Sequence, residues 1–267
     1  MSLQTVRIML MTVTIMLFSA RANAHEFWIA PHSYTPAEGD PVSVDLKVGQ
    51  MMSGAEYPYL SGKFRAFTAT AGGTTAAVQG IEGDVPALTY EAEAAGLNIL
   101  AIETLPLDIS FDSFAEFIEY LDYEGLRDIG EVHRQRGLPE TGITERYIRC
   151  AKSLLQVGPV LSSDFDRPIG MPFELVVAGN PYADAATAIN VMLLWNSKPV
   201  AGRQIAIFRK AETVSRNIVT TDARGMASIA VEPGGEYLLN AVQMTPLENQ
   251  PAMWESHWAS LTFQIRK

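Results

Sequence analysis

Residues 42–48 read VSVDLKV, and apolar and polar side chains alternate along the whole stretch. A strict period of two is typical of a β-strand with one buried face, and Gly49 marks the expected end of this strand. Residues 61–67 and 96–102 are similar, and two glycines at 72–73 supply a turn between them. This spacing of short strands and turns predicts a β-sandwich.

The last third of the chain is organised in the same way. Strands are expected over residues 190–195, 204–208, 226–231 and 236–241. Residues 221–225, which read TDARG, supply a turn before the third of these strands. The pattern predicts a second β unit in this part of the chain.

The residues between the two β regions follow a helical period instead. Apolar side chains at positions i, i+3, i+4 and i+7 are those of Phe114, Phe117, Ile118 and Leu121. This spacing predicts an amphipathic helix that begins after an N-cap at Asp112 or Ser113 and ends near Gly125. A second short helix is expected over residues 126–135, so the helical insertion spans about 111–137.

Together these patterns predict a mainly β fold of two β-sandwich units, Ig-like or transthyretin-like. The first unit covers residues 25–182 and carries the helical insertion, and the second covers residues 183–267. Residues 145–152, which follow the insertion, fit a strand or a helix almost equally well.

Residues 1–24 are predicted to be a signal peptide. Arg7 precedes an apolar run at residues 8–18, which is short for a membrane span, and residues 22–24 read ANA, a small-x-small cleavage pattern. An uncleaved N-terminal anchor is the alternative. Cleavage after Ala24 predicts an exported, periplasmic protein, and no later stretch is apolar enough for the mature chain to insert into a membrane.

Charge and cysteine content exclude several classes of protein. The chain has 30 Asp and Glu against 20 Lys and Arg, for a net charge of −10, which argues against nucleic acid as a partner. Its one cysteine, Cys150, cannot form an internal disulfide. The sequence lacks a serine-hydrolase elbow, a zincin helix, a phosphate-binding glycine loop and a Cys-x-x-Cys pair, so we name no catalytic residue and do not favour an enzyme.

Cleavage after Ala24 would make His25 the first residue of the mature chain. A terminal histidine carries a free α-amine and an imidazole on one residue, and together they can chelate a metal ion. Imidazole nitrogen suits copper, nickel, zinc and iron. The sequence therefore predicts a metal ligand at His25, with a second histidine completing a site similar to a histidine brace.

The other histidines of the mature chain are His32, His133 and His257. His32 lies in a proline-flanked segment seven residues after His25 and is the preferred second ligand. His257 begins the apolar face of an expected strand, which fits either a metal ligand or a core histidine. His133 lies in a charged helix and is expected to be exposed to solvent.

Four separated motifs resemble an exported bacterial family of domains of unknown function. They are AHEFWI at 24–29, FIEYLxxEGL at 117–126, ERYxRxAK at 145–152 and WESHWASLTF at 254–263. That family is associated with nickel and cobalt uptake, as a NikM- or CbiK-like periplasmic component. The resemblance implies a periplasmic, mostly β protein whose partner is an inner- or outer-membrane metal transporter.

A second resemblance concerns the C-terminal unit alone. KPVAG at 198–202, TDxxG at 221–225 and YLL at 237–239 are similar to the small sandwich of carboxypeptidase-regulatory and transthyretin-like domains. That fold binds or scaffolds more often than it catalyses, although a shared fold is weak evidence of function.

We therefore expect a periplasmic protein that binds a transition-metal ion, namely nickel, cobalt or copper, for uptake or buffering. A β-sandwich scaffold or ligand-binding protein without metal is the first alternative. A copper oxidase of the histidine-brace kind is the second.

Overall fold

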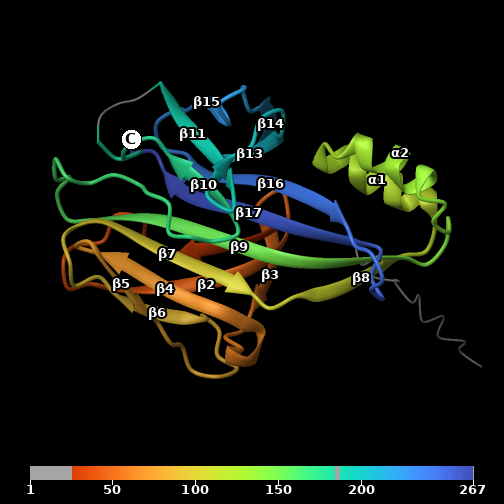
Figure 1. The fold of residues 1–267 in the computed structure, drawn as a ribbon. Helices are drawn as coiled ribbons and strands as arrows, with labels where there is room; N and C mark the ends of the chain where they lie inside the picture. Colours follow the sequence, from red (N-terminus) through yellow and green to blue (C-terminus); the bar gives the residue numbers. More distant parts are fainter. Residues whose placement is uncertain (1–25, 184–186, 267) are drawn as a thin grey trace, which may run out of the picture.

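The computed structural model describes residues 26–183 and 187–266. Within these ranges the chain forms three β-sheets and one pair of short helices (Figure 1). The predicted mainly β fold with a helical insertion is confirmed. Neither described helix is long and apolar enough to span a membrane. The predicted signal peptide and His25 lie outside the described residues.

A nine-stranded sheet forms the centre of the molecule. In order across the sheet its strands are β14 (Val214–Thr220), β13 (Gln204–Lys210), β16 (Glu236–Pro246), β17 (Trp254–Gln264), β9 (Ile143–Val157), β7 (Gly96–Thr104), β4 (Phe64–Ala71) and β5 (Thr74–Ala77), with β8 (Leu107–Phe111) beside β9. The pairing of β17 with β9 is parallel, and it joins the N-terminal and C-terminal halves of the chain in one sheet. The division into units at residues 182 and 183 stays a prediction.

Two smaller sheets lie outside the central one. The first contains β1 (Glu26–Pro31), β2 (Pro41–Gln50), β3 (Ser53–Tyr57) and β6 (Leu88–Glu91). The second contains β10 (Phe173–Val177), β11 (Ala188–Trp195), β12 (Lys198–Pro199) and β15 (Met226–Ala230). A 3-10 turn, η1 (Ser61–Lys63), precedes β4.

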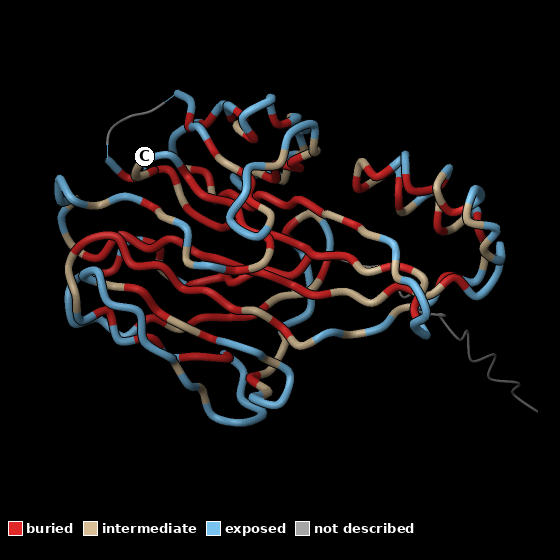
Figure 2. Tube along the Cα trace, in the orientation of Figure 1, coloured by how far each residue is buried: buried red, intermediate tan, exposed pale blue. Residues whose placement is uncertain are grey.

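The smaller sheets cover opposite faces of the central sheet. Successive side chains of a strand point to opposite faces, and β7 shows the consequence. Its Ile99 belongs to the apolar core that contains Phe173 of β10, whereas Leu100 belongs to the core that contains Val44 of β2. The central strands are therefore buried along most of their length (Figure 2).

The helical insertion forms a hairpin of α1 (Phe114–Glu124) and α2 (Arg127–Gln135). Ser113 is the N-cap of α1, since its Oγ accepts a hydrogen bond from the Glu116 N–H at 3.2 Å. The Glu116 carboxylate in turn accepts from the Asp112 N–H at 3.0 Å, which resembles a capping box. The buried apolar positions of α1 are Phe114, Phe117 and Leu121, as the spacing predicts. They pack against Trp254 and Trp258 of β17.

His133 is fully buried, so the expectation that it is exposed to solvent is wrong. It lies four residues after Ile129 on α2, and both side chains therefore face the sheet. Trp254 Nε1 donates to His133 Nδ1 at 3.1 Å. Because Nδ1 is the acceptor, the Nε2–H donates to the Pro139 carbonyl at 3.0 Å. His133 is thus a structural residue of the hairpin.

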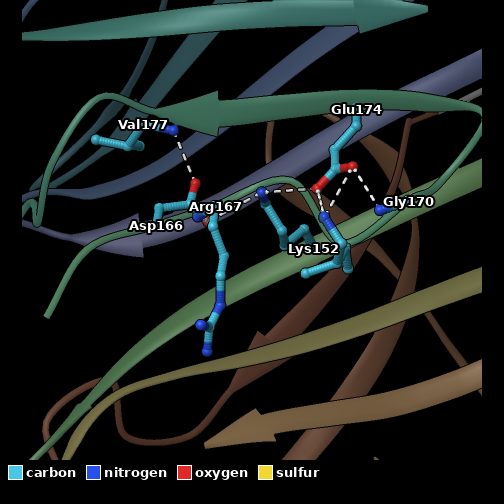
Figure 3. A network of polar contacts seen from close by, with 7 residues as sticks. Lys152, Asp166, Arg167, Gly170, Glu174 and Val177 are labelled. Carbon is cyan, nitrogen blue, oxygen red and sulfur yellow. Dashed lines mark hydrogen bonds and ion pairs between the residues drawn. The ribbon is translucent and has the colours of Figure 1, made fainter. Parts of the chain in front are cut away.

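A buried ion network connects β9 to β10 and to the loop that precedes β10 (Figure 3). Lys152 Nζ lies 3.0 Å from Asp166 Oδ1 and 3.2 Å from Glu174 Oε1. Backbone N–H groups that donate to these two carboxylates are those of Arg167, Ile169, Gly170 and Val177. Every carboxylate oxygen of the network has a donor, so the network holds the fold together and leaves no group for a ligand.

We expect Lys152→Met to lower the free energy of unfolding by about 3–5 kcal/mol, because two buried carboxylates lose their counter-ion. Urea denaturation at pH 7 would measure this change. The control is Lys198→Met on the exposed strand β12, which should change the free energy by less than about 0.5 kcal/mol. Equal effects of the two substitutions would show that the Lys152 network is not stabilising.

Candidate cation site beneath the helical hairpin

Three buried glutamates lie between helix α1, strand β1 and the central sheet. Glu26 is the first residue of β1, Glu124 is the last residue of α1, and Glu145 lies on β9. Their side chains are all nearly inaccessible to solvent. Glu124 is close enough to the other two for their charges to repel its own. We call Glu26, Glu124 and Glu145 the glutamate cluster.

The end of α1 fixes the position of Glu124. The carbonyl of Tyr123 accepts hydrogen bonds from Gln204 Nε2 and Arg216 Nη2, both at 2.9 Å. Gly125 then leaves the helix in the left-handed conformation, with φ of 71°. A Cβ on Gly125 would lie 2.7 Å from Gln204 Cβ, so both the backbone angle and the close approach require glycine. The helix therefore ends directly above the sheet and directs Glu124 into the interior.

Glu145 is held by hydroxyl groups. Its Oε1 accepts hydrogen bonds from the hydroxyl of Ser256 and, at 3.1 Å, from that of Tyr120. Trp258 Nε1 donates to Ser256 Oγ at 3.0 Å and so orients the serine. The second oxygen, Oε2, has no hydrogen-bond partner among the described residues.

Several other buried oxygens in this region also lack partners within the described chain. They are Oε1 and Oε2 of Glu26, Oδ1 of Asn240 and Oγ of Ser260. The Tyr123 hydroxyl is a weak donor to Glu26: the pair lies outside ordinary hydrogen-bond geometry, but the hydroxyl lowers the pKa of this carboxyl group. Asn240 Nδ2 donates to Glu124 Oε2 at 3.3 Å, and Ser260 is the cross-strand neighbour of Asn240. Leaving a buried polar group unpaired costs about 1–3 kcal/mol. The region has an excess of hydrogen-bond acceptors and fits a cation or a strong donor.

Arg216 supplies the positive charge that acts on the cluster in the described structure. It lowers the pKa of both Glu26 and Glu124 by charge attraction. Its guanidinium lies over the Tyr123 ring, 4.2 Å from the centroid, and forms no ion pair with a described glutamate. Arg216 alone therefore does not neutralise the charge of three carboxylates or supply their hydrogen bonds.

Burial makes these carboxyl groups weak acids. Desolvation raises the pKa of Glu26 and of Glu145 to about 7. Desolvation, together with the charge of Glu26, raises the pKa of Glu124 well above its ordinary value. The carboxyl groups consequently keep protons near neutral pH unless a cation binds beside them.

The family model of a domain of unknown function, DUF4198, matches residues 22–245. The chain belongs to this family. The description of DUF4198 names no metal, transporter or activity, and the match includes all three residues of the glutamate cluster. No curated protein matches the chain. Among solved structures, the D0-D1 domain of intimin is similar at 11% identity and a TM-score of 0.21, covering 88% of this chain and 97% of that one.

In this DUF4198 protein the two described histidines of the predicted metal set lie far from each other. His32 follows β1, its side chain is 56% exposed, and its Nε2 lies 3.0 Å from Asp45 Oδ2. Because β1 is extended, His32 lies roughly 20 Å along the strand from Glu26. His257 belongs to the opposite face of the central sheet, where its ring contacts that of Trp195 at 4.7 Å and burial lowers its pKa to about 4.

The structure does not bring His32 or His257 to the glutamate cluster. Within residues 26–183 and 187–266, no three His, Cys, Asp or Glu side chains are arranged to hold a metal ion. Since His25 lies outside these ranges, its role as a ligand stays a prediction, as do the roles of His32 and His257.

Glu124 and Glu145, like Glu26, are not among the ligands that the sequence predicts. A signal for both is present in the sequence. Glu124 follows Leu121 by three positions, so it lies on the apolar stripe of α1. Glu145 follows Ile143 by two positions and shares its face of β9. An acidic residue on the apolar face of an expected helix or strand is the pattern that indicates a buried carboxyl group.

We expect Gly125→Ala to destabilise the protein more than Gly137→Ala does. Both glycines have positive φ, 71° and 64°, but a Cβ at Gly137 would meet no atom within 4 Å. The left-handed conformation costs alanine about 1–2 kcal/mol at either position, and the contact with Gln204 adds to this at Gly125 alone. Urea denaturation of both variants gives the difference, and equal losses would contradict the close approach.

The stability of the protein should depend on pH through Glu145. Its pKa in the folded state, about 7, lies above the ordinary value of 4.5, so the folded state binds more protons between these values. Stability from this group is therefore greatest below pH 4.5 and is lost as the pH rises through 7. Glu145→Gln imitates the protonated carboxyl group and removes the effect.

The free energy of unfolding of Glu145→Gln, relative to the unsubstituted protein, should therefore rise by on the order of 2 kcal/mol between pH 5 and pH 8. Urea denaturation at several pH values would measure it. Taking the difference cancels His257, whose lowered pKa acts in the opposite direction between pH 4 and 6.5. Glu119→Gln, on the exposed side of α1, should show no such rise. A constant difference for Glu145→Gln would refute the raised pKa.

Proposed function

We propose that this protein is an exported, periplasmic transition-metal-binding protein whose metal site lies at the mature N-terminus. The observation that carries the proposal is the state of Glu26. This residue directly follows His25 in the sequence, and both of its carboxylate oxygens are buried, with the weak Tyr123 contact in place of a hydrogen bond of ordinary geometry in the described chain. A buried, unpaired carboxylate beside a chelating residue favours a bound cation.

In this proposal His25 provides two ligands, its α-amine and its imidazole nitrogen. Glu26 provides a carboxylate oxygen, which takes the place of the second histidine of a brace because β1 carries His32 away from the N-terminus. Glu124 and Glu145 add negative potential around the site and favour a divalent ion. The ligand set of nitrogen and oxygen suits nickel, cobalt or copper.

The resemblance to nickel- and cobalt-associated periplasmic components supports a role in metal uptake or buffering. An inner- or outer-membrane metal transporter is the proposed partner. The net charge of −10 is consistent with attraction of cations from the surrounding solution.

Metal titration of protein that begins at His25, as confirmed by mass spectrometry, tests the proposal. We expect tight binding of nickel, cobalt or copper by isothermal titration calorimetry. One extra glycine ahead of His25 separates the free amine from the imidazole and should weaken binding at least tenfold. Glu26→Gln should also weaken binding, whereas Glu119→Gln should not, because Glu119 lies on the exposed side of α1.

The other outcomes are equally informative. Equal binding with and without the extra glycine would locate the metal at internal residues such as His32 or His257. Absence of binding would refute the proposal and favour a β-sandwich scaffold or ligand-binding protein without metal. Copper-dependent peroxide production would favour the histidine-brace oxidase.

A further inference from the structure

We propose that a surface cavity beside the loop between β9 and β10 binds a free α-amino acid with an apolar side chain. The cavity has a volume of about 350 Å³ and lies between the β4–β5 turn, the start of β7 and residues 161–167 of the loop. This volume is within the range of small-molecule sites in proteins. No residue of the glutamate cluster lines the cavity, and the inference does not depend on the proposed function.

Three apolar side chains line the cavity. Leu97 of β7 is buried, whereas Leu161 and Phe165 of the loop are 42% and 55% exposed. Two large apolar side chains that lie in water beside a cavity indicate a surface that a ligand covers. Burying them against an apolar ligand is favourable, because it removes apolar area from water.

Asp164 supplies a carboxylate that is fixed in position. Its Oδ2 accepts hydrogen bonds from the Leu161 N–H at 2.8 Å and from Nε2 of the buried Gln156 at 3.2 Å. Its Oδ1 lies close to Gly96, where a Cβ would be only 2.6 Å away. Glycine at this position, with φ of 106°, therefore leaves room for the carboxylate.

Arg167 supplies the opposite charge. Its side chain extends away from the Lys152 network (Figure 3), and its guanidinium forms no hydrogen bond or ion pair with another described residue. Asp164 and Arg167 line the same cavity but do not pair with each other in the described structure. The guanidinium donors have the geometry that matches a carboxylate. A positive and a negative group are thus both available to a ligand.

These features match the three substituents of an α-amino acid. Arg167 suits its carboxylate, Asp164 suits its ammonium group, and the apolar wall suits its side chain. A simple anion would be repelled by Asp164, and a simple cation would be repelled by Arg167. Gly72 and Gly73 form the β4–β5 turn with φ of 54° and 84°, so this part of the cavity lining carries no side chain and leaves space for the ligand.

Isothermal titration calorimetry of the protein in EDTA tests the inference, because EDTA removes any metal that an amino acid could chelate. We expect saturable binding of L-leucine or L-phenylalanine with a Kd between micromolar and millimolar. N-acetyl-L-leucine, which lacks the ammonium group, and L-leucinamide, which lacks the carboxylate, should each bind at least tenfold more weakly. L-lysine should also bind at least tenfold more weakly, since the apolar wall offers no partner for its side-chain charge.

Substitutions test the two charged contacts. Arg167→Gln should weaken the binding of L-leucine at least tenfold. Arg224→Gln, at an exposed arginine that does not line the cavity, should change it by less than twofold. Asp164→Asn should also weaken binding at least tenfold, and the comparison with N-acetyl-L-leucine tests the same contact if this variant does not fold.

Absence of saturable binding by both L-leucine and L-phenylalanine would overturn the inference. Equal binding of L-leucine and N-acetyl-L-leucine, or an unchanged Kd in Arg167→Gln, would overturn it as well, because the charged groups of the cavity would then not hold the ligand. The inference and the proposed function can fail separately, since one is tested with amino acids in EDTA and the other with metal ions.

Discussion

The parallel pairing of β9 with β17 is the contact on which the rest of the structure depends. It joins a group of four strands, which ends in β17, to a group of five, which begins with β9, and the two smaller sheets cover opposite faces of the joined sheet. The same pairing brings Glu145 of β9 within hydrogen-bond distance of Ser256 of β17, which is 111 residues away in the sequence. The candidate site therefore exists only because strands from both halves of the chain lie side by side.

Local patterns in the sequence predicted individual elements well. The alternation at residues 42–48 corresponds to β2, and the apolar spacing that begins at Phe114 corresponds to α1. Residues 145–152 were ambiguous because β9 is buried on both faces and carries Lys152 and Glu145 among its buried side chains, which breaks the usual alternation. The ion network around Lys152 and the hydroxyls around Glu145 explain how a strand tolerates such residues.

Long-range features could not be read from the sequence. Both halves of the chain contribute strands to one sheet because β9 pairs with β17. The alternation of apolar and polar residues predicts a strand but does not indicate which strand it pairs with. The burial of His133 depends in the same way on Trp254, which lies 121 residues away. The sequence predicts a ligand at His25, whereas the structure shows that Glu26, the residue that follows it, is buried with two further glutamates, Glu124 and Glu145, from separate elements. The candidate site is therefore described by the buried acidic side chains and their place in the fold, and not by the histidines alone.

The packing of β1 has a consequence for the order in which the protein folds. The Thr262 hydroxyl donates to the Ile29 carbonyl at 2.7 Å, so the first described strand rests on a strand 233 residues later in the chain. Contacts of such sequence separation form slowly, because a long loop must close before they contribute. A polypeptide that emerges N-terminus first cannot make this contact between β1 and β17 until β17 has also emerged. The topology therefore delays the completion of this packing until the last described strand is present.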